Sequence, residues 1–122
     1  MENVTTITSG TLIAADKVQG TSVYNASGEK LGSVEDVMID KVSGRIIYAL
    51  MSFGGFLGMG EDYHPLPWST LKYDTHQGGY VVNLTKEQFE GAPLLARDGD
   101  FKWTPEYGRK IDQFYNAPNY WL

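Results

Sequence analysis

From Val18 onward, short runs of β-favouring residues alternate with turn residues at close intervals. This spacing is typical of an all-β barrel or sandwich, in which strands are short and connections are tight. Residues 45–53 form the most apolar run, with hydrophobic side chains at both even and odd positions. A strand of that kind is covered on both faces. The pattern therefore predicts a small all-β domain that contains this buried strand.

Glycine-containing turns separate the expected strands. They lie at residues 25–28, 40–44 and 77–79. Glycine adopts a positive φ without a Cβ clash, so each turn is expected to reverse the chain between two strands. Between the last two turns, Pro65 and Pro67 cannot donate ladder hydrogen bonds. Their strand is therefore expected at an edge or a bend of the sheet.

The strand after the first turn changes its parity partway along. Leu31 has the same parity as Ile39, whereas Val34 has the opposite parity. One extra residue resets which face each side chain meets, so we predict a β-bulge beside Glu35 and Asp36.

Two helical segments are expected after the last strand. Thr85 and Gln88 have the spacing of a capping box, which predicts a short helix that ends at Gly91. A second helix should begin with Thr104 as its N-cap and Pro105 at its first position. Its apolar stripe consists of Tyr107, Ile111 and Phe114. One such stripe does not hold a short helix in water, so the helix must dock on the barrel or on a partner.

Four segments, taken in their order, resemble the PRC-barrel family. They are residues 20–25, 28–34, 54–60 and 65–71. The resemblance covers about residues 16–95. It implies an assembly or adaptor module with a small antiparallel barrel, as in the cytoplasmic domain of the photosynthetic reaction centre H subunit and in ribosome maturation factors of the RimM type. The chain looks most like the stand-alone bacterial members, and no catalytic residues carry over from the family.

The expected fold class is thus an all-β, small antiparallel PRC-type β-barrel with a short helix after the last strand and a C-terminal helical extension. Residues 1–15 are expected to form a flexible arm, residues 16–95 the barrel, and residues 96–122 the helical and aromatic extension.

Composition narrows the function. A chain of 122 residues has room for one domain. The absence of cysteine excludes disulfides and thiolate chemistry and fits a cytoplasmic location. The net charge is −5 with scattered basic residues, which counts against nucleic acid and anionic membranes as partners. The longest apolar stretch, residues 46–51, is far shorter than the ~20 residues of a membrane-spanning helix.

Candidate metal and catalytic residues carry weak patterns. Glu61, Asp62 and His64 are the densest set of potential ligands, with Asp36 and Asp40 as further carboxylates. A hard cation wants six or more regularly spaced oxygens, so we favour a solvated turn over a metal site. A hydrolase that uses His64 would lack a nucleophile, and a second histidine, His76, lies in a predicted turn without a relay partner. We expect no catalytic residue, no metal and no cofactor.

The glycine-rich segment 54–60 carries the first candidate interaction residues, Phe56, Leu57 and Met59. Aromatic and Met-bearing surfaces are favoured at protein contacts. Two alternatives remain open for this segment. These side chains either contact a partner, or Phe56 and Leu57 fold back as a lid on the barrel end.

The C-terminal region carries the second set of candidates. Its aromatic residues are Trp103, Tyr107, Phe114, Tyr115, Tyr120 and Trp121. Aromatic side chains supply large contact area at low entropic cost. We expect Tyr107 and Phe114 to cover a seam of the same chain. Of the others, Trp103, Tyr120 and Trp121 are candidate interaction residues, and Tyr120 and Trp121 are expected in an intermolecular contact.

The leading hypothesis is a non-enzymatic interaction module that forms a homodimer and docks a protein partner. The alternative is a small-ligand binder whose pocket is lined by Tyr48, Trp68 and Phe56.

Overall fold

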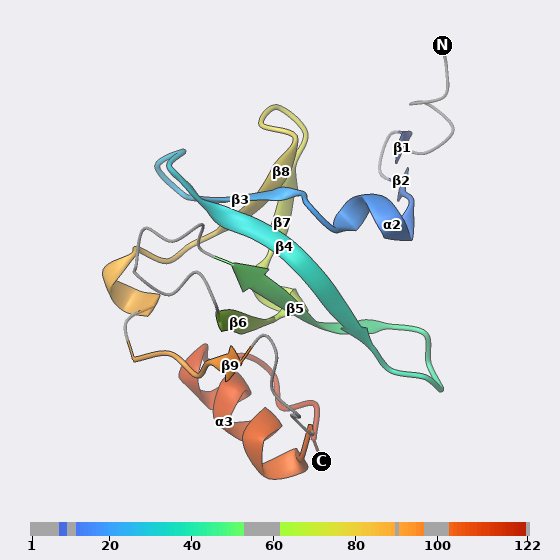
Figure 1. Ribbon diagram of the computed structural model, residues 1–122, viewed down its shortest axis with the longest axis vertical. Coiled ribbons are helices and arrows are strands. Elements are labelled where there is room, and N and C mark those ends of the chain that lie inside the picture. Colours follow the sequence, from blue (N-terminus) through green and yellow to red (C-terminus); the bar gives the residue numbers. More distant parts are fainter. Residues whose placement is uncertain (1–7, 10–11, 53–61, 90, 97–102, 122) are drawn as a thin grey trace.

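The computed structural model describes residues 8–9, 12–52, 62–89, 91–96 and 103–121 (Figure 1). Its main element is a mixed sheet with the hydrogen-bonded order β7-β8-β3-β4-β5-β6-β9. The strands are β3 (Ser22–Asn25), β4 (Lys30–Ile39), β5 (Ile46–Ser52), β6 (Asp62–Pro67), β7 (Lys72–Asp74), β8 (Gly79–Val82) and β9 (Leu95–Ala96). A separate short pair consists of β1 (Thr8–Ser9) and β2 (Leu12–Ile13).

The helical elements are short except for the last. They are α2 (Ala15–Val18), the 3-10 turns η1 (Trp68–Thr70) and η2 (Glu87–Phe89), and α3 (Pro105–Phe114). The capping box before η2 forms as predicted, because Thr85 N–H donates to Gln88 Oε1 and Gln88 N–H donates to Thr85 Oγ1. The N-cap of α3 is also confirmed, since Thr104 Oγ1 accepts from the N–H of Tyr107. Within the described residues, no helix is long and apolar enough to cross a membrane.

The expectation of a closed antiparallel barrel needs correction. Strands β3 and β8 pair in parallel, with Val23 opposite Tyr80. In the described part of the chain, β7 and β9 remain at the two ends of the sheet and no ladder joins them. The fold is therefore mostly β, as predicted, but its sheet is mixed and open.

Local features of the sheet agree with the sequence. The predicted turns contain Gly28, Gly44 and Gly78, each at positive φ. The predicted bulge is confirmed, because Val34 pairs with Met51 and the next pair joins Asp36 to Leu50. Glu35 is thus the extra residue.

The proline strand lies next to an edge of the sheet. Strand β6 pairs with β5 along Pro65 and Pro67, while its other neighbour, β9, pairs only with Asp62 and Tyr63. At Pro65 and Pro67, the edge of β6 away from β5 has no neighbouring strand among the described residues, so no ladder hydrogen bond is lost there through the absent N–H groups.

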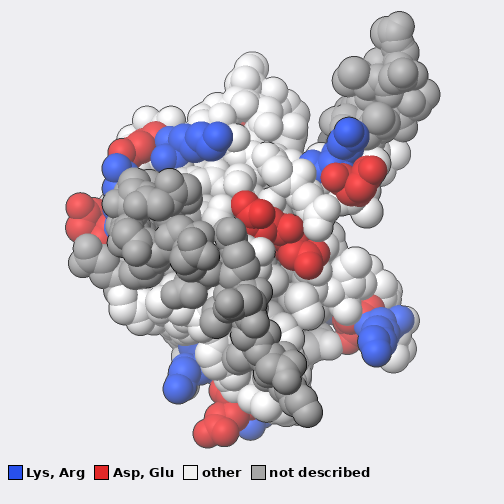
Figure 2. All heavy atoms as spheres, viewed as in Figure 1, with Lys and Arg blue, Asp and Glu red and all other residues white. Residues whose placement is uncertain are grey.

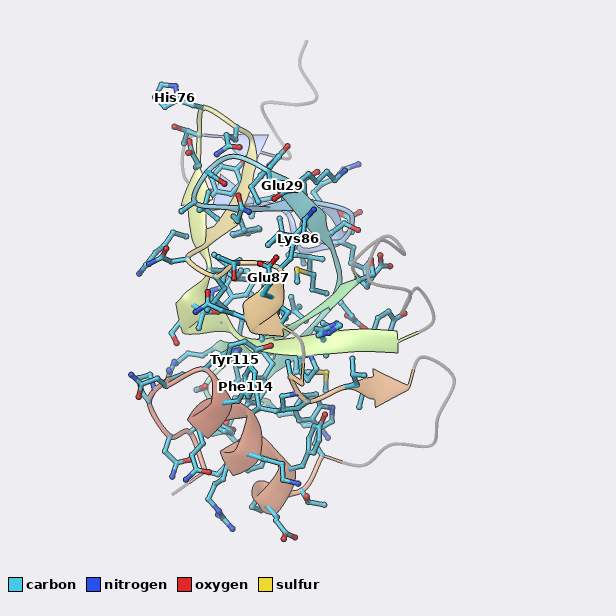
Figure 3. The ribbon with its side chains drawn as sticks, turned by 90° about the vertical axis from the view of Figure 1, so that its left-hand side faces the viewer. Glu29, His76, Lys86, Glu87, Phe114 and Tyr115 are labelled. Carbon is cyan, nitrogen blue, oxygen red and sulfur yellow. The ribbon has the colours of Figure 1, made fainter. Side chains whose placement is uncertain are left out.

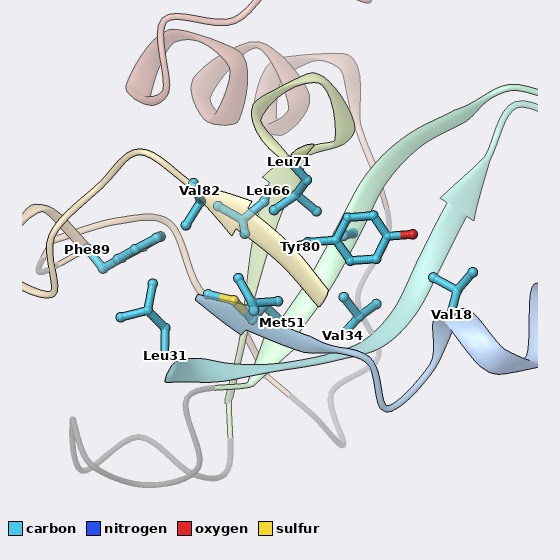
Figure 4. Close-up of a cluster of buried hydrophobic side chains, with 11 residues drawn as sticks. Val18, Leu31, Val34, Met51, Leu66, Leu71, Tyr80, Val82 and Phe89 are labelled. Atoms are coloured by element: carbon cyan, nitrogen blue, oxygen red, sulfur yellow. The ribbon is translucent and has the colours of Figure 1, made fainter. Parts of the chain in front are cut away.

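The core is one cluster enclosed by the bent sheet (Figure 4). Its side chains come from α2, β3, β4, β5, β6, β8, η2 and the residue before β7, and they are Val18, Val23, Leu31, Val34, Ala49, Met51, Leu66, Leu71, Tyr80, Val82 and Phe89. Strands from β8 to β6 reach the same cluster, so the sheet must curl strongly around it. Helix α3 lies outside this core, beside β6 (Figure 1).

Candidate functional site

The C-terminal segment, defined here as residues 115–121, packs against the β4–β5 hairpin. After α3 the chain turns at Asn116, whose φ is 54°. The Ala117 N–H then donates to the Asp112 carbonyl at 2.8 Å, and the Tyr120 N–H donates to Asp112 Oδ2 at 3.1 Å. These bonds bring the last aromatic residues beside the central strand β5.

Trp121 is anchored within the chain. Its Nε1–H donates to the Tyr48 hydroxyl at 2.6 Å, and the two rings lie 6.5 Å apart at 20°. The indole also lies directly over Gly108 of α3, because a Cβ at that position would be 1.9 Å from Trp121 Nε1. The Trp121 ring is thus packed against its own helix and strand, and its intermolecular contact stays a prediction.

A buried carboxylate holds the arrangement together. Asp112 is only 3% exposed. Its Oδ1 accepts from the Tyr48 hydroxyl at 3.0 Å, and its Oδ2 accepts the Tyr120 N–H. Burial, with the contribution of the neighbouring Asp112, raises the pKa of Tyr48 above its ordinary value. The Tyr48 hydroxyl thus stays protonated and can donate to Asp112.

A second carboxylate connects the hairpin turn to the C-terminal segment. Asp40 Oδ1 accepts from the N–H groups of Val42 and Ser43, at 2.9 and 2.8 Å. Asp40 Oδ2 accepts from the hydroxyl of Tyr120, eighty residues further along the chain. The hydrogen bond from Tyr120, followed by those of the turn, lowers the pKa of Asp40 to about 2. Asp40 is therefore ionised at neutral pH.

A recess of about 170 Å³ opens between the hairpin and the C-terminal segment. Its lining residues, which define the aromatic recess, are Met38, Ile39, Asp40, Ile47, Tyr48, Trp103, Tyr120 and Trp121. Trp103 stacks on Tyr48 with ring centroids 4.9 Å apart. Tyr120 lies nearly perpendicular to Trp121, at 85° and 5.0 Å. The recess is therefore an apolar hollow with aromatic walls and one carboxylate.

A wider groove of about 710 Å³ also includes Tyr120 in its wall. It runs between the start of β5, η1 and the C-terminal segment, and Arg45, Ile46 and Trp68 are among its lining residues. Ile47 and Tyr120 line both hollows.

Large apolar side chains are exposed at the same end of the molecule. Val42 in the turn is 97% exposed, Ile39 at the end of β4 is 52% exposed, and Tyr120 is 38% exposed. Ile39 and Tyr120 both line the aromatic recess. We call Ile39, Val42 and Tyr120 the hairpin patch.

The other predicted interaction residues have different outcomes. Phe56, Leu57 and Met59 lie outside the described residues. Trp103 belongs to the aromatic recess, where it stacks on Tyr48. The predicted pocket of Tyr48, Trp68 and Phe56 is not assembled by its described members, because the ring of Tyr48 packs with Trp103 and Trp121 while that of Trp68 packs on Tyr80.

The predicted stripe of α3 is only partly correct. Ile111 is buried and Tyr107 donates its hydroxyl hydrogen bond to the Leu94 carbonyl at 2.7 Å. Phe114, by contrast, is 42% exposed. Its neighbour Tyr115, labelled beside it in Figure 3, has its ring 6.2 Å from that of Phe89. Helix α3 is therefore rotated relative to the predicted stripe, so that Gly108 and Asp112 also face inward.

The candidate metal and catalytic residues are described only in part. No group of three His, Asp or Glu side chains suited to a metal occurs within the described residues. His64 is buried edge-on against Phe89 rather than placed in a solvated turn, which corrects the favoured expectation. His76 stands at the tip of the β7–β8 turn, far from the other labelled side chains (Figure 3). Glu61 lies outside the described residues.

Charged side chains are dispersed over the face shown in Figure 2, and Lys and Arg form no continuous area among the residues coloured there. One exposed ion pair joins Lys86 Nζ to Glu29 Oε2 at 2.5 Å, and both residues are labelled in Figure 3. An exposed pair of this kind contributes little to stability, because solvent screens its charges.

The sequence did not predict the roles of three residues of the site. Gly108 carried a usable signal, because a glycine inside a helical pattern costs stability and often has a packing reason. Asp112 gave only a weak signal, because an acidic residue directly after Ile111 of the apolar stripe can lie either in solvent or at the edge of the buried face. Tyr48 was assigned to a different pocket, since its partners lie more than fifty residues further along the chain.

Comparison with known proteins gives two findings. The model of the PRC-barrel domain family matches residues 10–89. A protein of Deinococcus radiodurans described as an uncharacterized protein is 32% identical over 69 residues, which make up 57% of this chain and 24% of that relative. Strands β4 and β5 therefore lie within the family match, whereas α3 and the C-terminal segment lie beyond it.

Proposed function

The chain belongs to the PRC-barrel domain family, and from this premise we propose that it is a non-enzymatic protein-interaction module whose contact surface is the hairpin patch. The proposal includes a cytoplasmic location, which the absence of cysteine supports. Its first partner is a second copy of the chain.

The observation that carries the proposal is the exposure of Val42 and Ile39 on one hairpin end. A turn can be built from polar residues, so apolar side chains there add nothing to the turn itself. Burying a side chain of this size at an interface contributes about 1.5–3 kcal/mol. Together with Tyr120, the patch supplies an apolar centre for a contact, and aromatic residues are enriched at such centres.

The experiment measures mass in solution. Light scattering coupled to size exclusion should give a dimer for the wild type at tens of micromolar, which corresponds to an association of about 6 kcal/mol or more. Val42→Asp should give a monomer, because it places a charge at the centre of the contact. Leu12→Asp is the matched control, since Leu12 is also highly exposed but lies on β2, outside the patch. It should remain dimeric.

A monomeric wild type would remove the second copy as the partner. The same two variants then test the wider proposal by affinity capture after cross-linking. A partner bound by Leu12→Asp and lost by Val42→Asp would support the hairpin patch as its binding surface. Equal capture by both variants would contradict the patch.

A further inference from the structure

We propose that the aromatic recess binds a small quaternary ammonium cation. This inference concerns a small ligand and does not require the proposed protein contact, although Ile39 and Tyr120 belong to both surfaces. It rests on three observations of the recess: the arrangement of its rings, the sign of its charge, and the bonds that fix its walls.

Four aromatic side chains line the hollow: Tyr48, Trp103, Tyr120 and Trp121. Tyr120 and Trp121 meet at 85° with ring centroids 5.0 Å apart, so the two rings form a corner of its wall. Trp103 and Tyr48 extend the aromatic wall as a stacked pair. A cation is attracted to the negative face of an aromatic ring, most strongly to that of tryptophan, and cages of this kind are the usual receptors of methylated ammonium groups.

The charge of the recess favours a cation over a neutral ligand. Asp40 is the one charged side chain among the described residues that line it. The carboxylate is ionised at neutral pH, because the bonds from Tyr120 and the turn hold its pKa at about 2. Of the described cations, Arg45 lines the wider groove and Arg109 donates to the carbonyl of Trp121, and neither is among the residues that line the recess.

The walls are fixed before any ligand binds. The Trp121 indole is bonded to Tyr48, whose hydroxyl is bonded to the buried Asp112. Tyr120 is held at both ends, its N–H by Asp112 and its hydroxyl by Asp40. A preformed site loses little affinity to the ordering of side chains. The remaining walls, Met38, Ile39 and Ile47, are apolar and suit methyl groups rather than a hydrated ammonium.

The test uses choline and its uncharged isostere 3,3-dimethyl-1-butanol, which differ in the nitrogen that carries the charge. Trp68→Phe leaves Trp103 and Trp121 as the fluorescent reporters, and both line the recess. Choline should change this fluorescence saturably, and the isostere should bind roughly 5- to 30-fold more weakly. The wild type is titrated in parallel by calorimetry, so the result does not depend on the Trp68 variant.

Two matched variants locate the site. Asp40→Asn and Asp74→Asn each alter an aspartate that accepts turn N–H groups, but Asp74 lies on β7, outside the recess. Asp40→Asn should weaken choline binding several-fold, whereas Asp74→Asn should leave it unchanged. Tyr120→Leu, which removes an exposed ring, should weaken it as well.

Equal binding of choline and the isostere, no binding of choline, or the same loss in both aspartate variants would each overturn the proposal. A peptide that contains Nε-trimethyllysine distinguishes the two sources of the cation. If it binds about tenfold or more tightly than choline, the cation is a modified side chain of another protein. If choline binds as tightly or more tightly, the cation is a free small molecule.

Discussion

Gly108 and Trp121 form a pair whose energetic coupling can be measured. A Cβ at position 108 would lie 1.9 Å from Nε1 and 2.1 Å from Cε2 of the indole. Gly108→Ala must therefore expel the ring, which in turn breaks the bond from Trp121 to the Tyr48 hydroxyl.

The magnitude follows from the contacts that are lost. Removing the indole forfeits one hydrogen bond, worth about 1 kcal/mol, and the burial of half an aromatic side chain, worth a further ~1–2 kcal/mol. Alanine inside a helix returns about 1 kcal/mol relative to glycine. Gly108→Ala should thus lower the free energy of unfolding by ~1–2 kcal/mol. Once Trp121→Ala has removed the ring, the same change should raise it by about 1 kcal/mol.

Urea unfolding followed by circular dichroism measures all four members of the cycle, and the effect of Gly108→Ala should change sign between the two backgrounds. The coupling should be ~2–3 kcal/mol. An identical effect of Gly108→Ala with and without the indole would refute the packing of Trp121 on α3.

Three further predictions follow from other contacts. Gly79→Ala should lower the free energy of unfolding by ~1–3 kcal/mol in urea, because its Cβ would lie 2.5 Å from the Ser22 carbonyl oxygen on the neighbouring backbone; an unchanged midpoint would contradict the close β3–β8 approach. Tyr120→Phe should raise the pKa of Asp40 from about 2 toward 3.8, as measured by carboxyl NMR titration. Since the pKa of Asp40 is lower in the folded than in the unfolded protein, its stabilising contribution is present above pH ~4 and is lost as the pH falls toward 2. A pKa that stays near 2 in the Tyr120→Phe variant would exclude the bond from Tyr120. Tyr115→Phe should leave the melting temperature unchanged or raise it, because the buried Tyr115 hydroxyl has no hydrogen-bond partner among the described residues; a loss above about 1 kcal/mol would show that the hydroxyl is bonded.

The features that sequence reasoning predicted correctly are local. The bulge at Glu35 followed from parity within one strand, and the capping box of Thr85 and Gln88 from residues three apart. Each depends on neighbours in the chain, so side-chain spacing alone specifies it.

The features that were missed depend on distant segments. Nothing in the residues of β3 or β8 indicates that the two strands pair in parallel, because the partners Val23 and Tyr80 are separated in sequence by most of the domain. The aromatic recess has the same origin: Tyr48 comes from β5, and its ring partners Trp103 and Trp121 come from the two sides of α3 in the sequence. Aromatic residues could be identified as contact residues by type, but their position in the same chain required the fold.

The parallel pair also sets an order in time. The β3–β4 hairpin closes over a short turn and can form early. The β3–β8 pair joins Val23 to Tyr80, so it closes a much longer loop and forms later. Until then, β3 presents an unoccupied row of backbone donors and acceptors. A chain arrested at that stage would offer this row to a neighbouring molecule, and self-association of the folding intermediate would begin there.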